Sequence, residues 1–266
     1  MILASDASPS LSLSLMVAVG YLVPAVALGG REPAARLIAL LAWVMHALLL
    51  ASRFSGDTPH FGFAAALSVT VWLIAAVYAV ESHFYPQLKI RWSLCALGSA
   101  AVLLAQIFPG SPLPASTSLW LPLHWALGIA SYGLFGVAVV HAWYLGRTED
   151  RMRRATSMEG GMPLLMIERL TFRFVAAGFV VLTATLLVAF VLRDSLYGPG
   201  VALRWDHKTI FSVLSWVAFA ALLLGRARFG WRGRRAVRML YAGAGLLFLA
   251  YVGSRFVLEV ILGRMP

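Results

Sequence analysis

The sequence predicts an all-α, polytopic integral membrane protein with eight transmembrane helices, from its composition and from the spacing of its apolar stretches. Of its 266 residues, 61% are hydrophobic and 12% are charged, and the mean hydropathy of +0.82 is far above that of an average soluble domain. The apolar residues form eight stretches, each long enough to cross a hydrocarbon core of roughly 30 Å as a helix. An even number of spans places both termini on one side of the membrane.

Turn residues and short charged connections separate the eight stretches. The stretches run approximately over residues 11–28, 34–50, 61–80, 90–108, 119–146, 172–192, 209–225 and 236–262. One connection, residues 147–171, is long and strongly charged, and its mixture of Arg with Glu149, Asp150 and Glu159 predicts a solvated cytoplasmic linker. Neither a convincing internal repeat nor a separate soluble domain is present. We therefore expect residues 1–266 to form a single transmembrane domain.

The basic residues predict the orientation of the spans. Sixteen of the 22 Lys and Arg residues lie in four connecting segments, and the other six are scattered near the opposite ends of the spans. By the positive-inside rule the rich segments face the cytoplasm. These segments hold Arg31 and Arg36, Lys89 and Arg91, Arg147 to Arg173, and Arg226 to Arg238. Both termini and the connections near Asp57, Pro112 and Gly200 are then expected on the non-cytoplasmic side.

Charge and cysteine content exclude several classes of protein. A net charge of +11 would suit nucleic-acid binding in a soluble chain, but these basic residues stand beside membrane spans. Anionic lipid headgroups are therefore the expected partner, and nucleic acid is not. The single cysteine, Cys95, lies within an apolar stretch, which excludes an intramolecular disulfide, a CxxC redox pair and a thiolate metal cluster. Because Asp6 and no basic residue precede Arg31, the first stretch is expected to remain a span and not to be a cleaved signal peptide.

Known catalytic patterns are missing from the sequence. There is no GxSxG or similar nucleophile motif and no phosphate-binding P-loop. Apart from Asp6, the acidic residues expected on the non-cytoplasmic side are Asp57, Asp194, Asp206 and Glu259, which are too widely separated to act as an acid and base pair. We therefore do not expect an enzyme.

Histidines supply the candidate site, because polar residues at span depth are the informative ones in a membrane protein. Of the six histidines, His83 and His141 fall on the cytoplasmic side and four fall near the other side: His46, His60, His124 and His207. An interfacial histidine is often only structural. As metal ligands, these four histidines lack the clustered carboxylates or thiolates that would complete a tetrahedral zinc site. Haem needs only one or two axial nitrogens, with an apolar, aromatic slot and cations for its propionates.

The expected non-cytoplasmic face offers such aromatic and cationic groups. They are Trp120, Trp125 and Trp205 as flat surfaces, and Arg53, Arg193, Arg204 and Lys208 as cations. Arg255 is the most informative cation because it lies within the last span, near its end, where an arginine is costly. An ion pair with Glu259, one helical turn later, is the alternative role of Arg255.

Several segments of the chain form a distinctive set. The first is Trp205-Asp206-His207-Lys208-Thr209, followed by Ser215-Trp216 and by Gly230-Trp231-Arg232-Gly233-Arg234-Arg235. Two others are His46 with Arg53, and Leu123-His124 through Ser131-Tyr132. The first resembles the tryptophan-rich haem-handling segment, and the other two the histidine-bearing spans, of the cytochrome c assembly protein family, which includes CcsA-, CcmC- and CcmF-like proteins. Met166 to Arg169 with Thr183, and Tyr251 to Phe256, resemble its short YpjD- and HemX-like branch.

The chain also departs from the family pattern. The tryptophan-rich segment is reduced, since residues 196–203 hold no tryptophan before Trp205. No histidine follows His207, so the second external histidine of the full synthetases is missing. His207 stands where the family has a proline, and it is either a substitute ligand or a residue that helps to start the span.

The resemblance implies a protein of the bacterial inner membrane that binds or handles haem b on the periplasmic side, as an accessory of cytochrome c maturation or haem homeostasis. His124 is then the first candidate for an iron ligand and His46 the second. Further haem-contacting residues are expected to be His207, Trp205, Asp206, Arg255 and Arg53. Other maturation or haem-pathway proteins are the implied partners. Two alternatives stay open: a transport-system subunit or regulator with the same fold and no haem, and a scaffold for an enzyme of tetrapyrrole synthesis.

Overall fold

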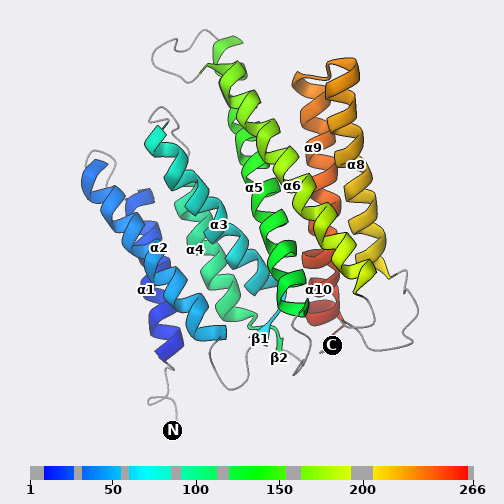
Figure 1. Cartoon of the computed structure of the whole chain (residues 1–266). Helices are drawn as coiled ribbons and strands as arrows, with labels where there is room; N and C mark the ends of the chain where they lie inside the picture. Colours follow the sequence, from blue (N-terminus) through cyan, green and yellow to red (C-terminus); the bar gives the residue numbers. More distant parts are fainter. Residues whose placement is uncertain are drawn as a thin grey trace. The chain divides into compact units, whose positions relative to one another are not determined.

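A computed structural model describes residues 9–26, 32–54, 60–84, 91–112, 120–153, 163–192 and 206–262 (Figure 1). The described chain consists of helices and one pair of very short strands. It divides into two compact units, which are treated separately here: unit 1 holds residues 1–113 with 265–266, and unit 2 holds residues 114–264. The division into two compact units does not test the predicted single domain over residues 1–266, which stays a prediction.

Among the described residues, unit 1 contains four helices. They are α1 (Pro9–Val26), α2 (Glu32–Phe54), α3 (Phe63–Phe84) and α4 (Arg91–Ile107). Helix α1 packs against both α2 and α4, and α3 packs mainly against α4. Buried side chains from α1, α2 and α4, including Val17, Tyr21, Leu49 and Val102, form the core. Apolar residues along each of these helices thus supply both the lipid-facing surface and the contacts between helices.

A two-stranded antiparallel ladder joins the ends of α3 and α4. Strand β1 (His60–Phe61) pairs with β2 (Ser111–Pro112), with His60 opposite Pro112. Gly110 precedes β2 with φ at 86°, and a Cβ atom there would lie 2.5 Å from the backbone nitrogen of Gly62. Only glycine fits this close approach. The sequence predicted a span from residue 61, whereas α3 begins at Phe63, because strands this short carry no detectable alternation.

The described part of unit 2 contains four long helices. They are α5 (Trp120–Arg153), α6 (Leu164–Val191), α8 (His207–Phe229) and α9 (Gly233–Phe248). Helix α9 continues through η1 (Leu249–Gly253), α10 (Ser254–Phe256) and η2 (Val257–Ile261), where η1 and η2 are π-helical. Helices α5 and α6 form one extensive pair and α8 and α9 another. The rings of Phe135 on α5 and Phe219 on α8 stack between them, with centroids 3.7 Å apart.

Six described helices are long and apolar enough to cross a membrane. They are Pro33–Arg53, Phe63–Phe84, Trp120–Asp150, Leu164–Val191, His207–Phe229 and Gly233–Ile261. Two further apolar helices, Leu11–Val26 and Ser93–Ile107, are shorter. The predicted all-α, multi-pass membrane protein is therefore confirmed, with six of the eight predicted spans reaching this length.

The charged segment from 147 to 171, predicted as a linker, is partly helical. Helix α5 continues to Arg153, and α6 begins at Leu164. Arg, Glu and Met are strong helix formers, so a helix that starts in an apolar span can extend beyond it into charged sequence. Residues 154–162 lie outside the described residues.

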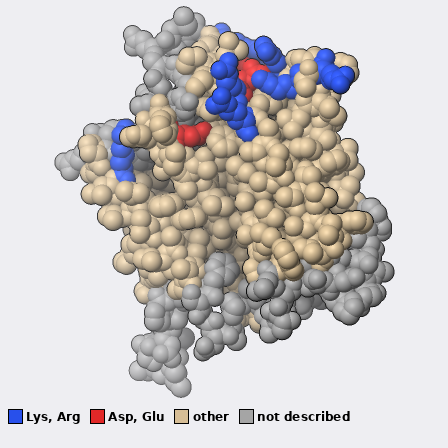
Figure 2. All heavy atoms as spheres, viewed as in Figure 1, with Lys and Arg blue, Asp and Glu red and all other residues tan. Residues whose placement is uncertain are grey.

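Basic residues gather at one end of unit 2, as the spheres at the top of Figure 2 show. Because α5 and α8 end where α6 and α9 begin, their arginines meet there. We call this the arginine end; it holds Arg147, Arg153, Arg169, Arg173, Arg226, Arg228, Arg232, Arg234, Arg235 and Arg238. The opposite end, which holds the starts of α5 and α8 and the end of η2, we call the His124 end. Lys208 and Arg255 lie toward it.

Candidate functional site

In unit 1, His46 is completely buried within a hydrogen-bonded network. Its Nδ1 atom lies 3.3 Å from the hydroxyl of Tyr21 on α1, and its Nε2 atom lies 2.8 Å from the hydroxyl of Ser68 on α3. Both ring nitrogens are therefore engaged, and the imidazole ties α2 to both neighbouring helices. Iron could bind His46 only by displacing Tyr21 or Ser68.

The surroundings of His46 are tightly packed. Trp43 and Trp72 stack with ring centroids 4.9 Å apart, and each indole N–H donates to the other residue's carbonyl at 3.1 Å. A nearby cavity, lined by Ser68, His60, Arg53 and four apolar residues, has a volume of about 10 Å³. This is room for about one water molecule, and not for a haem.

Arg53, the second candidate in unit 1, lies in the last turn of α2 and contacts the last turn of α4. It donates to the carbonyl of Ala105 at 2.6 Å and to the side-chain oxygen of Gln106 at 2.6 Å. The same Gln106 oxygen accepts from the hydroxyl of Ser14 at 2.9 Å. The last carbonyls of a helix lack partners and carry partial negative charge, so a cation there is favourable. Arg53 thus has a structural role, and its predicted contact with haem stays a prediction.

In unit 2, His124 lies in the first turns of α5 and presents an unsatisfied nitrogen. Its Nδ1 atom is buried and has no hydrogen-bond partner among the described residues. The ring lies close to the backbone of Thr185 on α6. The Nδ1 atom of His124 is therefore available to a ligand.

Two cations and a tyrosine lie at the same end. The Lys208 ammonium is 5.6 Å from the centre of the Tyr251 ring, and the Arg255 guanidinium is 5.9 Å from it. Lys208 is near enough to act electrostatically on both His124 and Arg255. Arg255 also lies 3.9 Å from Glu259, so the expected pair one turn apart is present. The cluster therefore combines a ligand nitrogen, an aromatic face and cations for an anion.

The helix that carries Tyr251 and Arg255 is irregular at this point. The π-helical segments η1 and η2 flank the three residues of α10, which include Arg255. The hydroxyl of Tyr132 on α5 donates at 2.6 Å to the carbonyl of Leu247, two residues before η1. π-Helical turns interrupt the α-helical bonding pattern and are frequent at functional sites. This irregularity had no signal in the sequence.

The remaining predicted residues at the His124 end have local roles or lie outside the described chain. Asp206 is the N-cap of α8, and its carboxylate accepts from the backbone N–H of Thr209 at 2.8 Å. His207 is exposed in the first turn of α8. Trp205 lies outside the described residues, so its predicted haem contact is untested. Residues that the sequence reasoning missed are Tyr21 and Ser68, the partners of His46.

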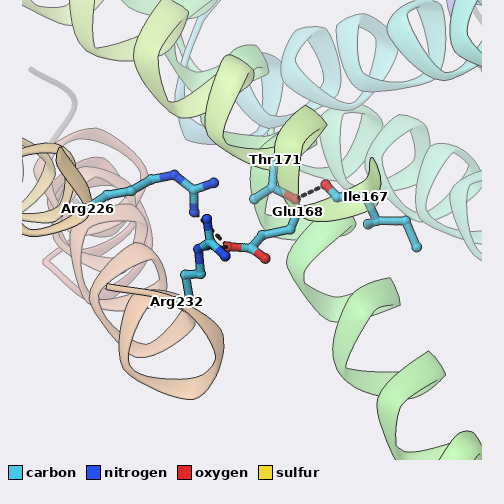
Figure 3. Close-up of polar contacts among 5 residues, drawn as sticks. All are labelled: Ile167, Glu168, Thr171, Arg226 and Arg232. Carbon is cyan, nitrogen blue, oxygen red and sulfur yellow. Dashed lines mark hydrogen bonds and ion pairs between the residues drawn. The ribbon is translucent and has the colours of Figure 1, made fainter. Parts of the chain in front are cut away.

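An ion pair at the arginine end joins α6 to α8 (Figure 3). The Arg226 guanidinium lies 2.7 Å from the Glu168 carboxylate. It also lies 3.6 Å from the centre of the Phe172 ring. Arg232 approaches the same carboxylate oxygen at 4.0 Å. Glu168 is thus held between cations from α8 and from the connection to α9. Across the described residues, no group of three or more His, Cys, Asp or Glu side chains is placed to hold a metal ion.

Fold and site together define a multi-pass helical membrane protein with a histidine and cations gathered at one end of a helical unit. Residues 33–262 match the family described as Cytochrome C assembly protein, so the chain belongs to that family. The resemblance seen in the sequence is confirmed.

Individual relatives match across most of the chain. It is 32% identical over 219 residues to an uncharacterized 28.8 kDa protein from the nifR3-like 5' region of Azospirillum brasilense, which covers 77% of this chain and 78% of the relative. It is 28% identical over 242 residues to the inner membrane protein YpjD of Escherichia coli K12, covering 88% and 89%. It is 25% identical over 253 residues to the cytochrome c biogenesis protein CcsA of Prochlorococcus marinus subsp. pastoris, covering 84% and 80%. No solved structure matches the chain.

Proposed function

We propose that this protein binds haem b at the His124 end of unit 2, with His124 Nδ1 as an iron ligand. The observation that carries the proposal is the buried Nδ1 atom of His124, which has no hydrogen-bond partner in the described chain and lies at the end that holds Lys208 and Arg255. A buried nitrogen acceptor in that condition costs free energy unless a ligand satisfies it. An imidazole nitrogen is a common axial ligand of haem iron. The experiment that tests this role is the His124 substitution that opens the Discussion.

Lys208, Arg255 and Tyr251 complete the proposed site. The two cations neutralise the propionates, and the ring of Tyr251 offers the aromatic surface between them. When bound, haem supplies a coordinated iron for redox chemistry or is itself the cargo. His46 is not part of the proposed site, because both of its ring nitrogens are already bonded.

We place this activity in cytochrome c maturation or haem homeostasis, at the bacterial inner membrane. The names of two relatives support this assignment, since one is a cytochrome c biogenesis protein and the other an inner membrane protein. The protein acts without enzymatic chemistry of its own, at most as part of a haem-attachment system. Its partners are other maturation or haem-pathway proteins.

A second candidate function is that of a transport-system subunit or regulator that keeps the fold without haem. The observation that favours it is the structural engagement of His46 and Arg53 in unit 1, which leaves neither side chain for a cofactor. This candidate predicts that the purified protein carries no haem, and that substitution of His124 changes only stability.

All eight apolar helices are proposed to span the membrane, with both termini in the periplasm. Helix α1 has 18 residues and α4 has 17, which at about 1.5 Å per residue gives lengths near the roughly 30 Å core. Both helices pack within unit 1 against longer, spanning helices. The positive-inside rule then places the arginine end in the cytoplasm.

Cysteine labelling tests this topology. With the buried Cys95 replaced by alanine, a cysteine at Ser5 is expected to react with a membrane-impermeant maleimide in intact spheroplasts. A cysteine at Ser157 is expected to react only after the membrane is permeabilised, because its connection carries the positive charge. Labelling of both positions from the same side would contradict the eight-span arrangement.

The proposed propionate contact predicts opposite effects for the two members of the Arg255–Glu259 pair. Arg255→Gln is expected to weaken haem retention, because a charge-assisted bond to a propionate is lost. Glu259→Gln is expected to leave haem retention intact or to improve it, because it frees the cation. Haem content and melting temperature are measured for both variants. Equal loss of haem from both would show that the pair serves only the packing of the last helix.

A further inference from the structure

We propose that the exposed face of α9 at the arginine end binds an anionic phospholipid, with the phosphate at Arg234 and Arg238 and an acyl chain along the helix below them. This site is separate from the proposed haem site and does not depend on it. The proposal starts from the distribution of exposed residues on α9. Arg234, Arg238, Tyr241, Gly245 and Phe248 are all exposed.

The spacing of these residues places them on one stripe of the helix. They follow one another at intervals of four, three, four and three residues, which is the repeat of a single helical face. The opposite face is buried through Ala236, Leu240, Gly243 and Leu247. The exposed stripe therefore has two guanidinium groups at its tip and apolar or aromatic groups below them.

Arg234 and Arg238 are not neutralised within the described part of the chain. The carboxylate of Glu168 is used by Arg226 and approached by Arg232. The other described acidic residues at this end are Glu149 and Asp150 on α5, and neither forms an ion pair with the two arginines. Two uncompensated guanidinium groups favour an anion, and phosphate is an anion that arginine binds well.

The lower part of the stripe fits a hydrocarbon chain. Tyr241 is 41% exposed and Phe248 is 45% exposed, and Gly245 lies between them. A Cβ atom added at Gly245 would find nothing within 4 Å, so the surface is open there. A ligand that satisfies both parts must carry an anionic group and an apolar tail. A phospholipid has this form, whereas free phosphate and an acidic protein surface match only the arginines.

Neighbouring α8 shows the same arrangement. Val217, Leu224 and Arg228 are exposed at intervals of seven and four residues, so an arginine again stands above an apolar stripe. Phe229, at the end of α8, is 77% exposed. Basic groups above lipid-facing stripes are typical of sites that hold anionic headgroups at the membrane surface.

Native mass spectrometry of the full chain in a neutral detergent tests the proposal, with dioleoyl phosphatidylglycerol and dioleoyl phosphatidylcholine as probes. We expect preferential binding of phosphatidylglycerol. The double variant Arg234→Gln, Arg238→Gln should weaken this binding roughly 25-fold, because each basic side chain near an anionic lipid contributes about a factor of five. The matched control is Arg147→Gln, Arg173→Gln, which removes the same charge from exposed positions at the same end. It should bind lipid nearly as the parent does.

Further arms separate the possible ligands. The variant Arg234→Lys, Arg238→Lys keeps the charge and should retain most of the binding, which shows that loss in the glutamine variant is not misfolding. Equal weakening in the glutamine variant and its control would overturn the proposed site in favour of diffuse attraction. Displacement of the lipid by inorganic phosphate would assign the arginines to free phosphate. The same conclusion would follow if short-chain dihexanoyl phosphatidylglycerol bound as tightly as the dioleoyl lipid, because the acyl chain would then contribute nothing. Unchanged lipid binding in the glutamine variant would overturn the proposal.

Discussion

A His124→Ala variant is expected to lose most of its haem, whereas a His141→Ala variant should keep it. The substitution removes the proposed iron ligand. Loss of a group that only orients a metal ligand already weakens metal binding about tenfold to a hundredfold, so loss of the ligand itself should weaken it at least as much. His141 is a matched control because it lies on the same helix and is buried, with its ring 5.4 Å from that of Phe174. It stands 17 residues from His124, about 25 Å along α5.

Haem content per protein and the visible spectrum of each purified variant provide the measurement. A shift of the spectrum in His124→Ala would show that the axial ligand changed. Equal haem content in the two variants would remove His124 from the proposed site. Melting temperatures measured alongside would reveal any loss of haem that follows from unfolding.

The second large effect is expected on stability, at the ion pair between α6 and α8. Glu168→Gln should lower the free energy of unfolding by about 2 kcal/mol, between the values for exposed and for fully buried pairs. The reason is that the side chains of Arg226 and Glu168 are only 27% and 14% exposed. Without the carboxylate, the partly buried guanidinium of Arg226 loses its counter-charge.

Arg232→Gln serves as the control for this pair. Its side chain is 68% exposed and lies 4.0 Å from Glu168, so its loss should cost less than about 0.5 kcal/mol. Thermal unfolding followed by tryptophan fluorescence compares the two variants in detergent. Similar small losses in both would mean that the carboxylate contributes little to the packing of α6 on α8.

The membrane helices could be predicted from the sequence because their signal is local. An apolar run of about 20 residues is visible without any partner, and α8 was expected over 209–225 and found over His207–Phe229. The start of α6 was missed by eight residues, since it was expected at 172 and begins at Leu164. Glu168 and Arg169 lie in the charged segment 147–171, which was expected to be a linker. Glu168 is accommodated in the helix by Arg226, 58 residues away, and pairing at that distance has no pattern in the sequence.

The candidate site shows the same division between local and distant information. The pair of Arg255 with Glu259 was expected from their spacing of four residues and is present. The engagement of His46 was not expected, because Tyr21 and Ser68 are 25 and 22 residues away and only the packing of three helices brings them together. The approach of Lys208 and Arg255 to one tyrosine likewise depends on how α8 packs against η1.

The visible absorption spectrum of the wild-type protein, gently purified from haem-sufficient cells, tests the central claim most directly. A haem protein shows an intense Soret band, and its haem can be extracted and identified by type. The proposed site predicts a Soret band from haem b in stoichiometric amount, which is lost in His124→Ala and kept in His141→Ala. A protein that shows no Soret band, and that gains none when titrated with haemin, would contradict haem binding and leave the haem-free transport or regulatory function.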